Sequence, residues 1–180
     1  MAVEIPIKMN TVRSHRIIQF FLERSKYWNK DNRDYSIYWS TSHMITTAQI
    51  MRLLAVMRGL NPDICAIAGA LHDIATMESG KHENHMVKSL EYIEPLLNEY
   101  NASSHCQNGK YGVSSEEIAL LKEIIPQHGD KDKISDNPYI EAIRDADAID
   151  RYLQGVETKE LEMPRLIVLF SKLNVDVKFI

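Results

Sequence analysis

The chain is poor in cysteine, and this absence removes two classes of small protein at the outset. Among its 180 residues only Cys65 and Cys106 are cysteines, and no C-x-x-C pair occurs. A disulfide-stabilised secreted domain needs a framework of bridges, and a thiolate zinc site needs paired cysteines. We therefore interpret both cysteines as structural or incidental and look to other side chains for chemistry.

The chain also lacks an excess of positive charge and a long apolar run. Its 21 Lys and Arg residues against 25 Asp and Glu residues give a net charge of -4, which offers no basic surface to a nucleic-acid polymer or a membrane. No apolar stretch reaches the roughly 18 residues of a membrane span, and the first residues do not resemble a secretory signal. We expect a cytoplasmic protein that binds neither membranes nor nucleic-acid polymers.

Apolar residues recur at helical spacing along most of the chain, which predicts an all-α, single-domain helical bundle over residues 1–180. Capping residues, first-turn prolines and a terminal glycine mark the boundaries. Ser14 and the Ser-Thr-Ser of residues 40–42 are the expected caps of the first two helices. The expected helices cover residues 14–29, 40–58, 61–73, 83–100, 114–128, 137–151 and 161–172. Residues 101–115 should form a surface loop long enough for a lid, and residues 175–179 a short strand or docked tail.

The helix that begins at Asn61 is apolar on nearly every side, yet it carries an adjacent histidine and aspartate, His72 and Asp73. Such a helix must be central and buried. Burial of an imidazole beside a carboxylate is costly unless something compensates both groups, and a bound metal ion does so. The pair therefore predicts a metal site.

Helical geometry selects one carboxylate from the acidic segment 144–150. At about 100° per residue, Asp147 falls within roughly 40° of Ile140 and Ile143, whereas Asp145 points more than about 120° away. We predict that Asp147 faces the core and that Asp145 faces water. Asp150 either orients a ligand histidine or has no special role.

The remaining histidines divide into two groups. His43 lies near the start of its helix, and His128 continues the apolar face of the helix before it, although Pro126 should end or kink that helix. His85 is expected at the edge of an apolar stripe. We interpret His15, His82 and His105 as ordinary hydrogen-bonded residues. The stripe beside His85 is formed by Met86, Leu90, Ile93 and Leu97, and the core methionines are Met44, Met51 and Met57.

The ordered set His43, His72-Asp73, His85, His128 and Asp147 resembles the HD-domain metal-dependent phosphohydrolases. The resemblance covers residues 42–150. The Leu-His-Asp-Ile-Ala of residues 71–75 is similar to the central motif of that family, and the Asp-Ala-Asp of residues 145–147 to its closing motif, in which the aspartate after the alanine is a ligand.

The resemblance implies an HD-type helical fold and a specific ligand set. Residues matching His43, His72, Asp73 and Asp147 hold one metal in the family, and histidines matching His85 and His128 add a second, with the aspartate matching Asp73 as the bridge. His72 and Asp73 are the expected catalytic residues. Imidazoles and carboxylates suit Mn, Fe, Co, Ni or Zn, and Mg less well.

The expected activity is hydrolysis of a small phosphomonoester or phosphodiester, with a nucleotide as the expected substrate, by metal-activated water. Developing charge also needs cationic donors. Five cations lie near the motifs: Lys81, Lys88, Lys131, Arg144 and Arg151. Most of them we interpret as solvated surface charges, and Lys81, Lys88 and Arg144 are our candidates for substrate binding.

Two other functions stay open from the sequence. Some relatives with the six-residue set are di-iron oxygenases, and a regulatory module could bind metal and a nucleotide without catalysis. The apolar segment 166–170 (Leu-Ile-Val-Leu-Phe) leaves room for a homodimer.

Overall fold

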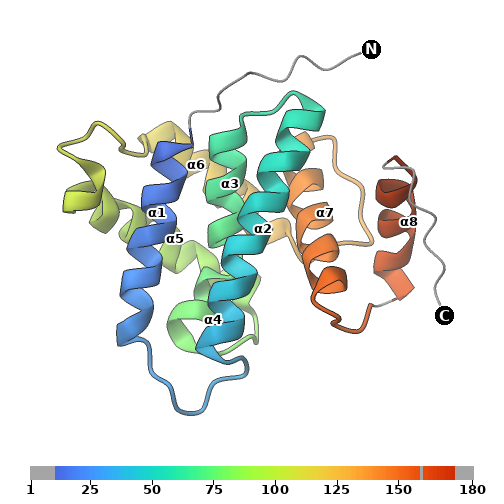
Figure 1. Cartoon of the computed structure of the whole chain (residues 1–180), viewed down its shortest axis with the longest axis horizontal. Helices are drawn as coiled ribbons and strands as arrows, with labels where there is room; N and C mark the ends of the chain where they lie inside the picture. Colours follow the sequence, from blue (N-terminus) through green and yellow to red (C-terminus); the bar gives the residue numbers. More distant parts are fainter. Residues whose placement is uncertain (1–10, 159, 173–180) are drawn as a thin grey trace.

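The computed structural model of the chain describes residues 11–158 and 160–172 (Figure 1). Within these ranges the chain forms α-helices joined by loops and single 3₁₀ turns, with no strand, which confirms the predicted all-α fold. The helices are α1 (Val12–Arg24), α2 (Ile37–Arg58), α3 (Pro62–Leu71), α4 (Ile74–Ser79), α5 (His85–Ala102), α6 (Ser115–Ile124), α7 (Pro138–Leu153) and α8 (Met163–Lys172).

Helix α3 is the centre of the bundle. Asn61 caps it by accepting hydrogen bonds from the backbone N–H groups of Asp63 and Ile64, and Pro62 occupies its first turn. Every residue from 64 to 71 is buried. The helix packs most extensively against α2 and also contacts α1, α6 and α7. The structure therefore places α3 at the centre of the bundle, as its apolar sequence predicts.

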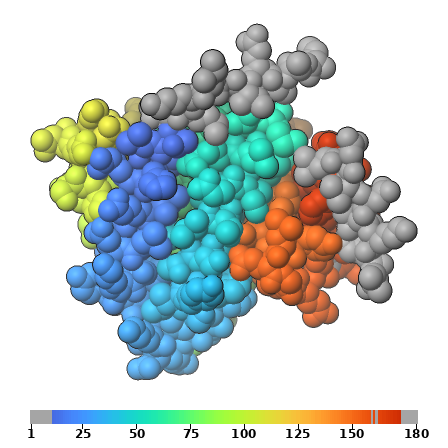
Figure 2. All heavy atoms as spheres, in the orientation of Figure 1, coloured from blue at the N-terminus to red at the C-terminus, as the bar shows by residue number. Residues whose placement is uncertain are grey.

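The other helices surround α3. In Figure 1, α1 and α7 lie on either side of the α2–α3 pair, α5 and α6 lie behind it, and α8 packs against α7 at the edge. Figure 2 shows α2 between α1 and α7 on the near face of the molecule. No described helix has the length and apolar character needed to cross a membrane.

Several predicted helix starts differ from the structure. α2 begins at Ile37, where Ser36 has an extended backbone and its side chain accepts from the N–H of Trp39, so the serines and threonine of residues 40–42 lie inside the helix. α1 begins at Val12, and Ser14 is buried within its first turn. α1 is preceded by Thr11, whose side chain makes no capping hydrogen bond, and for α2 the sequence contains serines at 36, 40 and 42, of which Ser36 is the cap.

Side-chain burial corrects two further expectations. In α5 the residues buried toward the core include His85 and Ser89, whereas Leu90 is 39% exposed. Ile93 and Leu97 of the predicted stripe are fully buried, as expected, and only the first turns of the helix differ, because the interior next to them is polar. Met57 is also exposed, at 40%.

Asp145 does not face water. Its side chain is buried and forms ion pairs with Arg58 of α2 and with Arg165 of α8, at 2.7 Å for the latter. Helical phase correctly turned it away from the α7 stripe that faces α3. The opposite side of α7 is covered by α8, so both faces of the helix are enclosed.

The segment 101–115 is not placed as a lid. It contains the 3₁₀ turn Ser104–Cys106, whose Cys106 is fully buried and which packs against α1 and α5. Residues 175–179 lie outside the described residues.

Candidate metal centre

His72 and Asp73 occupy the junction at which α3 ends and α4 begins. His72 is the last residue in helical conformation after α3, and Asp73 takes φ −102° and ψ 23° before α4 starts at Ile74. This break aims two neighbouring side chains at the same interior point, which a continuous helix would not do because successive residues differ by about 100°. Both side chains are buried, as the sequence predicted for a pair that a metal ion would stabilise.

Four donor atoms form a compact set around this junction. His43 Nε2 from α2 lies 2.9 Å from His72 Nε2, 3.3 Å from Asp147 Oδ1 and 3.6 Å from Asp73 Oδ2. His72 Nε2 lies 3.7 Å from each of the same two carboxylate oxygens. Ligands at about 2.0–2.2 Å from one ion are about 3.0–3.5 Å apart, so this set has the size of one coordination sphere.

A second set shares Asp73 with the first. The other oxygen of Asp73, Oδ1, lies 3.2 Å from His85 Nε2 and 3.4 Å from His128 Nε2, and these two nitrogens are 3.0 Å apart. His85 is the first residue of α5, and His128 follows the 3₁₀ turn Ile125–Gln127 that contains Pro126. The proline-induced turn redirects the chain and still leaves His128 buried toward the centre. Three overlapping groups able to hold a metal are formed, and together they contain all six residues predicted from the sequence.

The hydrogen bonds of the imidazoles test whether the site fits a metal. In three of them Nδ1 donates to a backbone carbonyl three residues earlier, and in the fourth it pairs with a carboxylate. Nδ1 of His72 donates to the carbonyl of Gly69, Nδ1 of His85 to that of His82, and Nδ1 of His128 to that of Ile125. Nδ1 of His43 donates to the carboxylate of Asp150. A neutral imidazole whose Nδ1 carries the proton has a bare Nε2, so in their neutral forms the four rings direct four lone pairs toward this point. Asp73 Oδ1 is buried without a hydrogen-bond partner in the described chain. Converging lone pairs and an unsatisfied carboxylate oxygen fit a cation.

The titration of the metal-free cluster agrees with this geometry. Burial lowers the pKa of His72 and of His85 to about 4, so both are neutral at pH 7. Burial also acts against charge on His43, but Asp147 and Asp150 outweigh it and raise its pKa to about 10. Burial alone would raise the pKa of Asp147, whereas Lys131 and His43 hold it well below the usual range. A pKa of about 10 means that a metal ion binding at His43 has to displace a proton from this imidazole.

Asp150 holds His43 in place. Its carboxylate pairs with His43 Nδ1 and accepts a hydrogen bond from the side chain of Gln154, while the His43 ring stacks on Trp39 with 4.6 Å between centroids. A carboxylate on the far nitrogen of a ligand imidazole fixes the ring and makes it a better donor. Of the two roles left open by the sequence, the structure places Asp150 in the orienting one.

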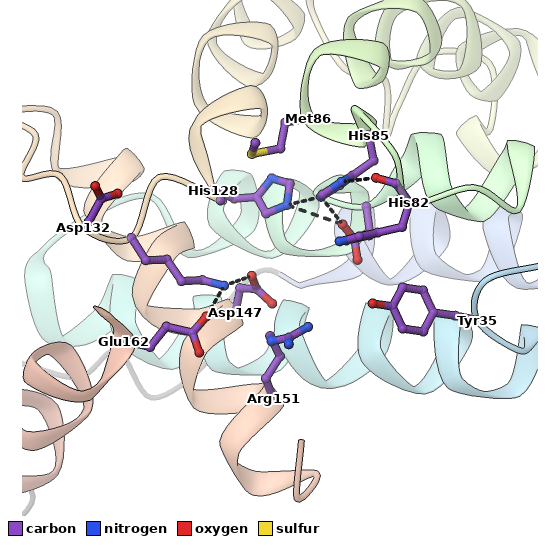
Figure 3. Close-up of a pocket in the computed structure, with 12 residues that line it drawn as sticks. Tyr35, His82, His85, Met86, His128, Asp132, Asp147, Arg151 and Glu162 are labelled. Carbon is purple, nitrogen blue, oxygen red and sulfur yellow. Dashed lines mark hydrogen bonds and ion pairs between the residues drawn. The ribbon is translucent and has the colours of Figure 1, made fainter. Parts of the chain in front are cut away.

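Asp73, His85, His128 and Asp147 of these two sets line a cavity of about 450 Å³, and His43 and His72 lie behind this lining (Figure 3). His82 lies in this lining, with its ring stacked on His85 at 3.9 Å between centroids and its Nδ1 buried without a partner in the described chain. It is therefore not the ordinary hydrogen-bonded histidine that we expected. The lining residues are Tyr35, Asp73, His82, His85, Met86, His128, Gly129, Lys131, Asp132, Asp147, Arg151 and Glu162.

None of the three cations expected to bind substrate lines this cavity. Lys81 bonds to Asn32 and Asp34 at the surface, and Lys88 lies on α5 outside the lining. Arg144 is buried, where it donates to the backbone carbonyls of Gln127 and Lys133 and to Glu141. The cations that do line the cavity are Lys131 and Arg151. All five cations lie near the motifs in sequence, so sequence proximity does not show which of them reach the cavity.

A family model described as HD domain matches residues 41–152, more than half of the chain. The chain belongs to the HD domain family. This confirms the resemblance found in the sequence and places the chain in a superfamily of metal-dependent phosphohydrolases. Neither a search of curated proteins nor one of solved structures found a significant match.

Proposed function

We propose that this HD domain protein is a metal-dependent hydrolase of small phosphate esters, with a nucleotide as the expected substrate. The observation that carries the proposal is the pair of histidine clusters joined by the two oxygens of Asp73, with Asp73, His85, His128 and Asp147 lining one cavity. A divalent metal bound there would activate water and neutralise charge on a phosphoryl group. Mn, Fe, Co, Ni and Zn all suit imidazole and carboxylate donors.

The residues have distinct tasks in this proposal. His43, His72 and Asp147 would hold one ion, His85 and His128 a second, and Asp73 would contribute one oxygen to each. His72 and Asp73 act as ligands in this arrangement, which is the sense in which we expect them to be catalytic. Asp150 keeps the His43 ring in position.

Lys131 supports the site from the opposite side. Its Nζ lies 2.6 Å from Asp147 Oδ2 and 3.1 Å from Glu162 Oε1, and its side chain is 10% exposed. The ion pair with Lys131 engages Oδ2 of Asp147, and the other oxygen, Oδ1, is directed at His43 and His72. We assign Lys131 a positioning role.

The test is metal-dependent phosphate release. Purified protein is stripped with a chelator, reloaded separately with Mn, Fe, Co, Ni or Zn, and assayed on a panel of nucleotides and simple phosphate esters. We expect turnover in the wild type and in Glu94→Gln, whose side chain pairs with Lys122 on the surface. Asp73→Asn should lose more than about 100-fold, because both clusters depend on that carboxylate.

Other results would point to the other functions. The absence of turnover with every metal would contradict the hydrolase. Saturable nucleotide binding without turnover would instead favour a regulatory module, and oxygen-dependent turnover of the iron-loaded protein would favour an oxygenase.

A further inference from the structure

Lys131 and Arg151, the two cations that line the cavity, differ in whether their charge is already paired. The charge of Lys131 is taken up by Asp147 and Glu162, as described above. The guanidinium of Arg151 forms no hydrogen bond or ion pair with any group of the described chain. A new ligand can therefore bind Arg151 without breaking an existing contact.

Arg151 is directed into the cavity. It lies on α7 one helical turn beyond Asp147, which places both side chains on the same face of the helix. Figure 3 shows its guanidinium between Asp147 and Tyr35, on the side of the cavity opposite Met86. A solvated surface arginine is the plain alternative, but Nε of Arg151 is buried and has no partner. Burial of a donor on a charged group is costly unless a hydrogen-bond partner satisfies it, and of the arginines with such a buried Nε (Arg16, Arg52 and Arg151) only Arg151 lines the cavity.

Tyr35 brings a second unused donor to the same place. Its ring is held by stacking on Trp39, with 4.5 Å between centroids, and by an edge contact with His82 at 5.3 Å. Its hydroxyl, which Figure 3 shows pointing toward the cavity, forms no hydrogen bond within the described ranges. A guanidinium and a phenol therefore face the cavity from the side opposite the second histidine cluster.

The charge of the cavity favours an anionic ligand once metal is bound. Its lining holds four carboxylates, of Asp73, Asp132, Asp147 and Glu162, and two cations, which leaves a charge of −2 with neutral imidazoles. Two divalent ions would change this to +2. A phosphomonoester dianion matches that charge, and it offers three terminal oxygens that can be shared between metal and a planar guanidinium. A phosphodiester has one negative charge and one terminal oxygen fewer.

We propose that Arg151, assisted by the hydroxyl of Tyr35, forms an oxyanion subsite that binds the terminal phosphoryl oxygens of a phosphomonoester. This inference rests on the proposed phosphohydrolase function and narrows it from phosphate esters in general to monoesters. Arg151 contacts the substrate in this assignment, whereas Lys131 acts through Asp147.

Inorganic phosphate is the probe for this subsite, because it is the expected product and needs no turnover. Its binding to metal-loaded wild type, Arg151→Gln, Arg151→Lys and Tyr35→Phe is measured by calorimetry, with metal content determined on each sample. Arg16→Gln is the matched control, since Arg16 also has a buried Nε without a partner but lies on α1 outside the cavity lining.

We expect Arg151→Gln to weaken phosphate binding about 10- to 100-fold at unchanged metal content, which is the effect of losing a charge-assisted contact. Arg151→Lys should recover part of the loss, Tyr35→Phe should weaken binding about 3- to 10-fold, and Arg16→Gln should match the wild type. On p-nitrophenyl phosphate, Arg151→Gln should raise KM by a similar factor, with a smaller effect on bis-p-nitrophenyl phosphate.

Three results would overturn the proposal: phosphate binding by Arg151→Gln within twofold of the wild type, a parallel loss of metal, or no phosphate binding by the wild type. Its failure is distinguishable from failure of the hydrolase. An Arg151→Gln protein that binds phosphate and hydrolyses monoesters normally refutes the subsite alone. Wild type that binds phosphate through Arg151 but hydrolyses nothing supports the subsite and refutes the hydrolase.

Discussion

Gly69→Ala tests the contact that brings the first two histidines together. A Cβ at Gly69 would lie 2.9 Å from the carbonyl oxygen of Thr47 and 3.0 Å from Ala48 Cα, both backbone atoms of α2, and 3.0 Å from Met51 Cγ. Backbone atoms cannot rotate away as a flexible side chain can, so α2 and α3 would have to separate by a few tenths of an ångström. This seam sets the position of His43 relative to His72.

Two effects of opposite sign act at this position, and their magnitudes decide the outcome. Alanine is a better helix former than glycine by up to about 1 kcal/mol. Overpacking of a well-packed interior typically costs about 1–3 kcal/mol, and contacts with backbone belong to the upper part of that range. We expect a net loss of about 1–2 kcal/mol, which for a chain of this size lowers Tm by about 2–8 °C.

The assay is thermal unfolding of the metal-free protein, followed by a metal titration. Gly112→Ala is the comparison, because there the nearest atom to a new Cβ, the carbonyl oxygen of Gly109, is at 3.3 Å, which needs a smaller shift than at Gly69, and the backbone angle is ordinary. Gly69→Ala should lower Tm and weaken metal binding, while Gly112→Ala should change both little. A higher Tm for Gly69→Ala would show that helix propensity outweighs crowding and would refute the close-packed seam.

Four further predictions concern the metal and the ion pairs. His72→Ala should remove all bound metal in elemental analysis and His85→Ala only part of it; equal losses would argue against two sites. Because the pKa of His43 is raised to about 10 in the metal-free protein, metal must displace its proton near neutral pH, so apparent affinity should rise with pH between about 6 and 9 and about one proton should be released per first ion in an unbuffered titration. Asp150→Asn should weaken metal binding about 10- to 100-fold with little change in fold, as judged by circular dichroism, and unchanged affinity would remove its orienting role. Asp145→Ala should cost about 1–3 kcal/mol in urea unfolding, since it removes the ion pair of Arg58 and one of the two carboxylates that pair with Arg165, the other being Glu141, whereas a solvent-facing aspartate would cost less than about 0.5 kcal/mol.

Sequence reasoning was most successful where a single helix determined the answer. Asp147 was chosen over Asp145 by helical phase alone, and the structure places its Oδ1 3.3 Å from His43 Nε2. The same reasoning failed for the environment of Asp145 because burial of the second face of α7 depends on α8, which is distant in sequence. The spacing of apolar residues identifies the helix face that packs against one neighbouring helix. It does not show whether a second helix covers the opposite face.

The cations around the site show why the rest could not be predicted. Lys81, Lys88 and Arg144 were chosen for their proximity to the motifs in sequence, and the cavity instead contains Lys131 and Arg151. Lys131 is paired with Asp147 and with Glu162, which reaches it from the segment before α8, whereas the guanidinium of Arg151 has no partner in the described chain. An ion pair across 31 residues has no local signal, so the sequence could not show which cation would remain available.

Helix α7 unites these observations. Asp147, Asp150 and Arg151 follow the i, i+3, i+4 spacing that places side chains on one helical face, and they are assigned here to metal binding, to the orientation of His43 and to oxyanion binding. One rigid turn thus sets three distances at once, and a change in the position of α7 should alter metal retention and phosphate affinity together. Arg151→Gln removes a single side chain from that turn and should separate the two. The comparison between that variant and one that displaces α7, such as Asp145→Ala, therefore distinguishes a direct contact with phosphate from an indirect effect through the metal ligands.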